Sequence, residues 1–139
     1  MPLPEIALNK IKERLGEEKA SSVRWMVDDI TQPINIQNLM DIAVWHDRAV
    51  LHFLLEESQQ QMYLSTLKKV VKKGGYVILA AFSLKGAKKC SGLDIKNYDQ
   101  NMLAKFLGED FSLLEYFDYT FYMRSGNLRP YIYALFQRK

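Results

Sequence analysis

The sequence predicts an α/β fold in which a mainly parallel sheet ends in an antiparallel hairpin. Apolar runs of strand length alternate with segments of helical periodicity, which is typical of sheets whose strands are joined by helices. The aromatic-rich C-terminal part is split by Ser125-Gly126-Asn127, which predicts the hairpin. With 139 residues, 48% hydrophobic and 25% charged, we expect a single domain over residues 1–139.

The N-terminal part predicts a helix followed by a strand. Apolar residues at helical spacing place the helix over residues 4–15, and Gly16 suits its C-terminal cap. The β-branched and aromatic run 23–27 predicts a strand that ends at the acidic pair Asp28-Asp29.

The central part predicts two more strands with helices between them. A second strand over residues 39–45 ends in His46-Asp47-Arg48, and a short helix is expected over 48–55. A helix over 57–73 stops at two glycines, and the apolar run 76–82 predicts a strand covered on both faces.

The C-terminal part predicts a loop, a helix and the hairpin. The loop covers residues 84–97, and Asp99 suits the N-cap of a helix over 100–107. The hairpin strands are expected over 111–123 and 128–137. Their aromatic residues indicate strand packing, although an aromatic face also suits an organic substrate.

Composition excludes several classes of function. The net charge of +3 comes from interleaved charges, so no nucleic-acid partner is indicated. No apolar run is long enough for a membrane span and no signal peptide is visible. Cys90 is the single cysteine and is interpreted as non-catalytic; it indicates a reducing compartment, with the cytoplasm as the expected location. One cysteine and two histidines do not supply a zinc site, so no metal is expected.

Polar residues follow two predicted strands at the edge where parallel sheets bind ligands. In Asp28-Asp29-Ile30, a carboxylate beside an apolar side chain suits an adenine ring, whereas the alternative is an Asx turn that Asp29 starts. In the run from Trp45 to Leu54, His46 suits a site or a scaffold equally. Asp47 suits a helix cap and His52 a buried scaffold position.

Three tracts of the sequence stand out together: Val23 to Thr31, the run from Trp45 to Leu54, and Leu67 to Phe82 with its Gly74-Gly75. In residues, order and spacing they resemble the later part of class I S-adenosylmethionine-dependent methyltransferases. The resemblance implies a Rossmann-like sheet of strand order 3-2-1-4-5-7-6, S-adenosylmethionine as the cofactor and a small-molecule methyl acceptor.

The resemblance also implies a cofactor site. Asp29, with Asp28, would contact the adenine amino group, and Ile30 would cover the ring. Trp45 and His46 would lie beside the methionine moiety. Arg48 would face the acceptor.

One departure from the family is large. The sequence begins where the second strand of that fold ends, and none of its seven glycines forms a G-x-G-x-x-G turn after a strand. We therefore expect a partial domain that lacks the first two strands and the Gly-rich loop, with cofactor binding weakened or lost. The exposed sheet edge would be covered in a homodimer, or strands 23–27 and 39–45 would pair directly.

Two functions remain open from the sequence. The first is a truncated methyltransferase, inactive alone, in which positioning drives methyl transfer and His46 or Asp47 is the candidate base. The alternative is a non-catalytic interaction module that pairs through its exposed sheet edge.

Overall fold

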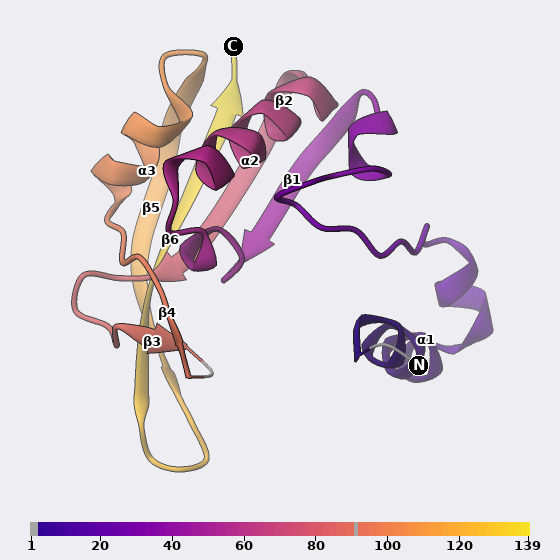
Figure 1. Cartoon of the computed structure of the whole chain (residues 1–139), viewed down its shortest axis with the longest axis horizontal. Helices are drawn as coiled ribbons and strands as arrows, with labels where there is room; N and C mark the ends of the chain where they lie inside the picture. Colours follow the sequence, from indigo (N-terminus) through magenta and orange to yellow (C-terminus); the bar gives the residue numbers. More distant parts are fainter. Residues whose placement is uncertain (1–2, 91) are drawn as a thin grey trace.

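The computed structural model describes residues 3–90 and 92–139, which build a mixed sheet with the strand order β1-β2-β6-β5 (Figure 1). Its strands are β1 (Ile42–Arg48), β2 (Val71–Phe82), β5 (Phe111–Tyr122) and β6 (Leu128–Arg138). β1 and β2 pair in parallel, whereas β6 runs antiparallel to both of its neighbours, β2 and β5. The predicted antiparallel hairpin is confirmed, and the described sheet is mixed, with one parallel and two antiparallel pairings. A single helical crossover joins β1 to β2 and allows them to pair in parallel, and the tight hairpin makes β5 and β6 antiparallel.

The order of the four strands agrees with the order that the resemblance implies. In chain order β1, β2, β5 and β6 correspond to strands four to seven, and their arrangement β1-β2-β6-β5 reproduces the series 4-5-7-6. Within the described residues, β1 is an edge strand paired only with β2. Its other edge carries free backbone donors and acceptors.

Two helices cover one face of this sheet and form the core with it (Figure 1). They are α2 (Glu57–Val70) and α3 (Gln100–Leu107). The core side chains that are almost fully buried come from both helices and from β2 and β6: Leu67, Val70, Leu103, Leu107, Val77, Leu79, Ile132 and Phe136. The helix over 100–107 is confirmed, and the Asp99 carboxylate accepts from Met102 N–H at 2.8 Å as an N-cap.

The opposite face of the sheet is covered only towards the C-terminal end of β2. There a second cluster contains Ala80, Phe82 and Tyr131, beside the short hairpin of β3 (Lys89–Cys90) and β4 (Leu93–Asp94). In the N-terminal half of the same strand, Tyr76 is 40% exposed. The prediction that this strand is covered on both faces therefore holds only for its C-terminal half.

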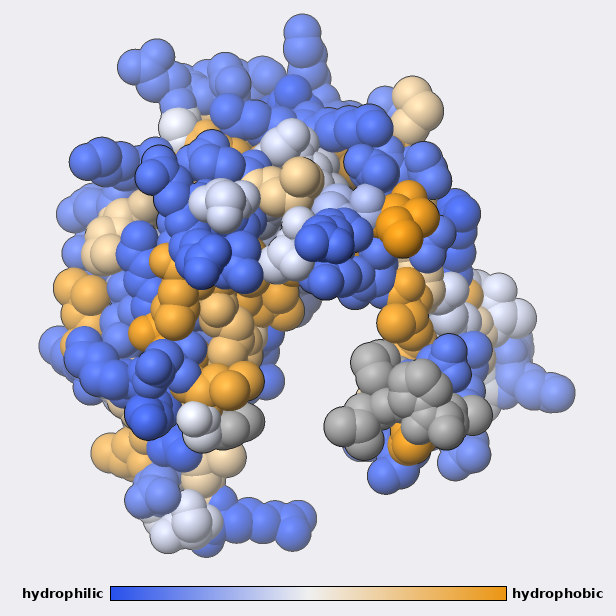
Figure 2. Space-filling view, viewed as in Figure 1, coloured by the Kyte–Doolittle hydropathy of each residue, from blue (hydrophilic) through white to orange (hydrophobic). Residues whose placement is uncertain are grey.

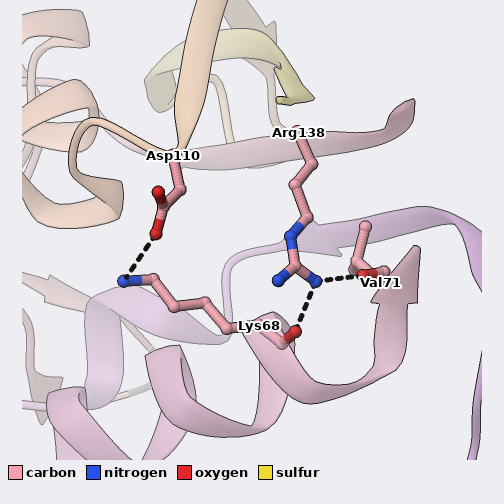
Figure 3. A network of polar contacts seen from close by, with 4 residues as sticks. All are labelled: Lys68, Val71, Asp110 and Arg138. Carbon is pink, nitrogen blue, oxygen red and sulfur yellow. Dashed lines mark hydrogen bonds and ion pairs between the residues drawn. The ribbon is translucent and has the colours of Figure 1, made fainter. Parts of the chain in front are cut away.

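The end of α2 is fixed by a polar network (Figure 3). Nη1 of Arg138, from β6, donates to the backbone carbonyls of Lys68 and Val71. The Lys68 ammonium lies 3.7 Å from the Asp110 carboxylate, just before β5. These contacts satisfy backbone carbonyls where the helix ends. The helix α2 therefore ends at Val70, three residues before the predicted end at residue 73, and β2 begins at the next residue.

The N-terminal helix extends beyond its prediction. In α1 (Leu3–Ser21), Gly16 has a φ of 81° as expected for a cap, but a further helical segment follows it. Trp25 packs back onto this helix, because its Nε1 donates to the Ala20 carbonyl at 3.0 Å and Lys12 lies 5.3 Å from its ring.

The predicted strand over 23–27 is wrong. These residues form no strand, and they do not pair with residues 39–45. A β-branched run forms a strand only beside another strand edge, and in the described part of the chain none lies next to this segment.

The segment around β1 is shifted relative to its prediction. Residues 36–38 form a 3₁₀ turn, and the strand runs from Ile42 to Arg48 instead of 39–45. Ala49 then adopts a φ of 67°, so the expected helix over 48–55 is reduced to one 3₁₀ turn at Leu51–Phe53. Because the chain turns sharply only at Ala49, the residues Trp45 to Arg48 all belong to β1.

Candidate cofactor site

A cavity of about 500 Å³ lies along β1, from Ile42 to Arg48. Small-molecule sites span roughly 300–1,000 Å³. Its walls come from β1, from α2 and from the loop before β1, and it contains four of the five residues expected from the sequence: Asp28, Ile30, Trp45 and His46. Apolar side chains of Ile36, Leu39 and Ile42 complete the walls. In the space-filling view, a hollow separates the sheet body from the limb that carries α1 (Figure 2).

Asp28 organises the loop that forms one wall of this cavity. Its carboxylate accepts from the backbone N–H groups of Ile34, Asn35 and Ile36 at 2.8–3.1 Å, and from its neighbour Asp29 at 3.0 Å. These hydrogen bonds, that of Ile36 first, hold the pKa of Asp28 below its ordinary value. The ionised carboxylate is therefore used to shape the loop.

Asp29 forms the Asx turn that the sequence offered as the alternative to an adenine contact. Its Oδ1 accepts from the Thr31 N–H at 2.9 Å and from the Thr31 hydroxyl at 2.6 Å. Asp29 does not line the cavity. An ionised carboxylate offers about four acceptor positions. The two bonds to Thr31 therefore leave Asp29 with acceptor capacity.

Trp45, Tyr63 and Asp47 form a hydrogen-bonded series beside the cavity. Trp45 Nε1 donates to the Tyr63 hydroxyl at 3.0 Å, and this hydroxyl donates to Asp47 Oδ2 at 2.5 Å. The Asp47 carboxylate also accepts from the N–H groups of Val50 and Leu51 at 2.8 and 3.0 Å. Asp47 therefore caps the turn after β1, as its scaffold interpretation predicts.

Burial changes the acidity of both partners in this series. Burial raises the pKa of Asp47, although its hydrogen bonds from Tyr63 and the turn oppose the increase. Burial and the Asp47 charge raise the pKa of Tyr63 well above its ordinary value, so the phenol keeps its proton.

The two histidines have different environments. His46 is exposed on the cavity wall, where a bound molecule can reach its imidazole. His52 is fully buried between the rings of Phe53 and Phe82, and its Nδ1 accepts from the Phe82 N–H at 3.2 Å. Burial lowers the pKa of His52 to about 4, so its ring is neutral at pH 7. The scaffold interpretation of His52 agrees with this packing.

Tyr63 is the site residue that sequence reasoning missed. The sequence pattern that could have identified Tyr63 is its helical spacing with Leu67 and Val70, which places its hydroxyl on the buried face of α2. A buried phenol needs a partner, and such a position therefore indicates a polar group on the facing strand.

The strand order, the cavity and its residues can be compared with known proteins. No protein-family model matches the sequence, and no curated protein matches it either. Solved structures do match in their fold. One is a SAM-dependent methyltransferase from Methanosarcina mazei, with a TM-score of 0.57, 13% identity and coverage of 76% of this chain and 65% of that one. The chain has a class I methyltransferase-like fold.

Two further methyltransferase structures extend this comparison. The 1,6-didemethyltoxoflavin-N1-methyltransferase of Burkholderia thailandensis, with bound 1,6-didemethyltoxoflavin and S-adenosylhomocysteine, has a TM-score of 0.66 and 14% identity, covering 100% of this chain and 58% of that one. The N-methyltransferase NodS of Bradyrhizobium japonicum, in complex with S-adenosylhomocysteine, has a TM-score of 0.58 and 13% identity, covering 87% of this chain and 58% of that one. This chain thus spans 58 to 65% of the length of these three methyltransferases.

The described residues offer neither a metal-ligand cluster nor a membrane-spanning helix. Within residues 3–90 and 92–139, no three His, Cys, Asp or Glu side chains come together as metal ligands. No helix of the same residues is both long and apolar enough to cross a bilayer.

Proposed function

We propose that this chain is the cofactor- and acceptor-binding later part of an S-adenosylmethionine-dependent methyltransferase that acts on a small molecule in the cytoplasm. The observation that carries the proposal is the cavity along β1, which collects Asp28, Ile30, Trp45 and His46 within a methyltransferase-like fold. A partial domain is consistent with the share of the neighbours' length that the chain spans.

The walls of the cavity suit the cofactor's adenosine end. Ile30 and Ile36 offer apolar surface for a flat ring. Asp29 does not itself line the cavity, but it lies between Asp28 and Ile30, which do, and its carboxylate keeps acceptor capacity for the amino group of that ring. Trp45 would lie beside the methionine moiety, held in place by its hydrogen bond to Tyr63. When bound, S-adenosylmethionine supplies an electrophilic methyl group on a sulfonium sulfur.

The protein's own contribution is positioning and proton removal. Asp28 holds the loop and Tyr63 holds Trp45, so both sides of the cavity are ordered before a ligand enters. Asp47 is a poor general base because its carboxylate is buried and already accepts three hydrogen bonds. His46, exposed at the cavity, is the candidate base for an acceptor that must lose a proton.

Calorimetric titration of the full chain with S-adenosylhomocysteine tests this proposal. We expect binding by the wild type at roughly millimolar ligand or below, and its loss in Asp29→Ala because the adenine amino group loses its acceptor. The matched control is Asp118→Ala, because Asp118 is an exposed residue of β5 away from the cavity. Absence of heat in the wild type, or equal binding by Asp29→Ala, would count against the assignment.

A second candidate function rests on the open edge of β1. Val44 on this strand is 50% exposed, and its free backbone groups can pair with a strand from another chain. In this alternative the chain is a non-catalytic module, and a homodimer through β1 is one form of it. Sedimentation equilibrium distinguishes the two: a concentration-dependent oligomer without cofactor binding favours the interaction module.

A further inference from the structure

A second cavity, of about 390 Å³, lies beyond the end of β1 on the sheet face that α2 and α3 leave uncovered. Its walls combine two arginines, Arg48 and Arg129, with the aromatic rings of Phe82, Phe121 and Tyr131. Arg48 also lines the first cavity, so the two cavities adjoin at this side chain.

The position of Arg48 depends on its neighbours in the sheet. Its register partner on β2 is Ala80, whose small side chain leaves the space above the strand open. The guanidinium lies 4.4 Å from the ring centre of Phe121 and 5.1 Å from that of Tyr131, on the far strands of the sheet. A planar cation on two ring faces is a stable arrangement that leaves its N–H groups available.

The aromatic rings form a braced wall. Tyr131 meets Phe82 and Phe121 edge to face, with ring centres 5.1 Å apart in both pairs. Such contacts fix the orientations of the rings, so the wall keeps a defined shape. Tyr131 is buried, with only 6% of its surface exposed.

The two positive charges are not neutralised by the protein. In the described part of the chain, neither Arg48 nor Arg129 has a carboxylate within 4.0 Å, since the ion pairs there are Lys68 with Asp110 and Lys89 with Asp94. Arg129 Nη1 donates only to the carbonyl of the adjacent Leu128, at 3.2 Å. Two cations without a counter-ion in a partly enclosed cavity favour an anion between them.

We propose that this second cavity binds a planar aromatic anion, of the hydroxylated aromatic carboxylate class, and that such a molecule is the methyl acceptor. Its ring hydroxyl would form the new bond to the methyl carbon as the carbon–sulfur bond of the sulfonium breaks, with S-adenosylhomocysteine as the leaving group and His46 taking the hydroxyl proton. Its carboxylate would pair with Arg48 and Arg129, while its ring packs on the partly exposed ring of Phe121, which the buried Tyr131 supports. The acceptor role rests on the proposed function. The binding of the anion does not, because it requires only the residues of this cavity.

Cys90, the single cysteine of the sequence and also part of the cavity wall, supplies a direct reporter. The test follows the rate at which the full chain reacts with 4,4′-dithiodipyridine, a neutral reagent, in the presence of 2-naphthoate, its neutral amide 2-naphthamide, or acetate. We expect 2-naphthoate to slow the reaction several-fold at saturation. The amide and acetate should each need at least about tenfold higher concentration for the same protection, because the first lacks the charge and the second the ring.

Variants identify the groups responsible. Arg48→Gln and Arg129→Gln should each raise the concentration of 2-naphthoate needed for half protection by about tenfold or more, since each removes a charge-assisted hydrogen bond. Arg14→Gln removes an equal charge from the exposed surface of α1 and should change nothing. Arg48→Lys keeps the charge and should retain part of the preference for the acid over the amide.

Equal protection by the acid and the amide, or protection unchanged in both arginine variants, would overturn the inference. If Arg48→Gln unfolds, the wild-type comparison and Arg129→Gln still decide. Failure of this inference is distinguishable from failure of the proposed function, because S-adenosylhomocysteine binding is measured separately at the first cavity. Protection without cofactor binding would retain the anion site and reject the methyltransferase role.

Discussion

Replacing Tyr63 by Phe should destabilise the protein although it removes a single oxygen atom. The Tyr63 side chain is 1% exposed, and its hydroxyl joins Trp45 Nε1 to the buried carboxylate of Asp47. Phenylalanine keeps the ring and its edge contact with Trp45, whose ring centre lies 5.4 Å away. The substitution therefore isolates the hydrogen bonds from the packing.

The size of the effect follows from these two bonds. A hydrogen bond to a charged group contributes about 1.5–3 kcal/mol, and Asp47 would keep only its two backbone donors. Trp45 is half-buried, so its indole N–H can turn to water and adds no more than about 1 kcal/mol. We expect the free energy of unfolding to fall by about 2–4 kcal/mol, with a decrease in melting temperature of roughly 6–15 °C for a domain of this size.

Urea unfolding followed by circular dichroism measures this difference, and pH supplies a second check. The difference should be largest where Asp47 is ionised in the folded protein and should shrink as the pH falls through its raised pKa, because the bond then joins neutral groups. Tyr76→Phe is the matched control, because Tyr76 is 40% exposed. The reasoning is refuted if Tyr63→Phe changes stability by less than about 0.5 kcal/mol, as the control should.

Three further predictions concern stability, each measured by urea unfolding. The pKa of His52 is about 4 in the folded protein against an ordinary 6.5, so the unfolded chain binds more protons between these values. Stability should fall by up to about 3 kcal/mol as the pH decreases through this window. His52→Phe should abolish that dependence and His46→Gln should retain it; a dependence that survives in His52→Phe contradicts the assignment. Arg138→Gln should cost about 1–3 kcal/mol by freeing the carbonyls at the end of α2, whereas the exposed Arg124→Gln should be neutral. Gly75→Ala should cost roughly 1–3 kcal/mol, because its Cβ would lie 2.9 Å from the Lys72 carbonyl oxygen and 3.1 Å from that of Ala43; an unchanged midpoint would show that the backbone there yields.

The parts of the fold that were predictable are those specified by local sequence. The helix 100–107 has an N-cap at Asp99 and a stop at Gly108, and the hairpin has a Ser-Gly-Asn turn between aromatic strands. Gly16 adopts the predicted left-handed conformation, although the chain becomes helical again after it. Each of these signals acts within a few residues, so the chain around it needs no distant partner to respond.

The strand at residues 23–27 could not be predicted correctly because strand formation is not local. Its β-branched and aromatic residues suit a pleated surface, but pairing requires an adjacent edge. The open edge of β1 is not beside this segment. The Asx turn at Asp29, which directly follows this segment, was predictable as an alternative. It depends only on the hydrogen bonds from Thr31 and not on the conformation of residues 23–27.

The candidate sites show the same division between local and distant information. Asp28, Ile30, Trp45 and His46 are candidates from the sequence because each follows or ends an apolar run, and in the structure all four line one cavity. Tyr63 was missed because its partner, Asp47, is 16 residues away and on another element. No pattern within the helix identifies which strand its hydroxyl will meet.

Arg48 illustrates how a charged residue acquires a role that its neighbours in sequence do not specify. Beside His46 and Asp47 it suits a solvated strand end, and the aromatic residues of the hairpin suit strand packing. The sheet order places β5 and β6 across β2 from β1, and the alanine between them lets the guanidinium reach both rings. If the proposed anion site exists, packing and ligand recognition are not alternatives for these aromatic residues, because the edge-to-face contacts between them also hold Arg48 at the boundary of the two cavities.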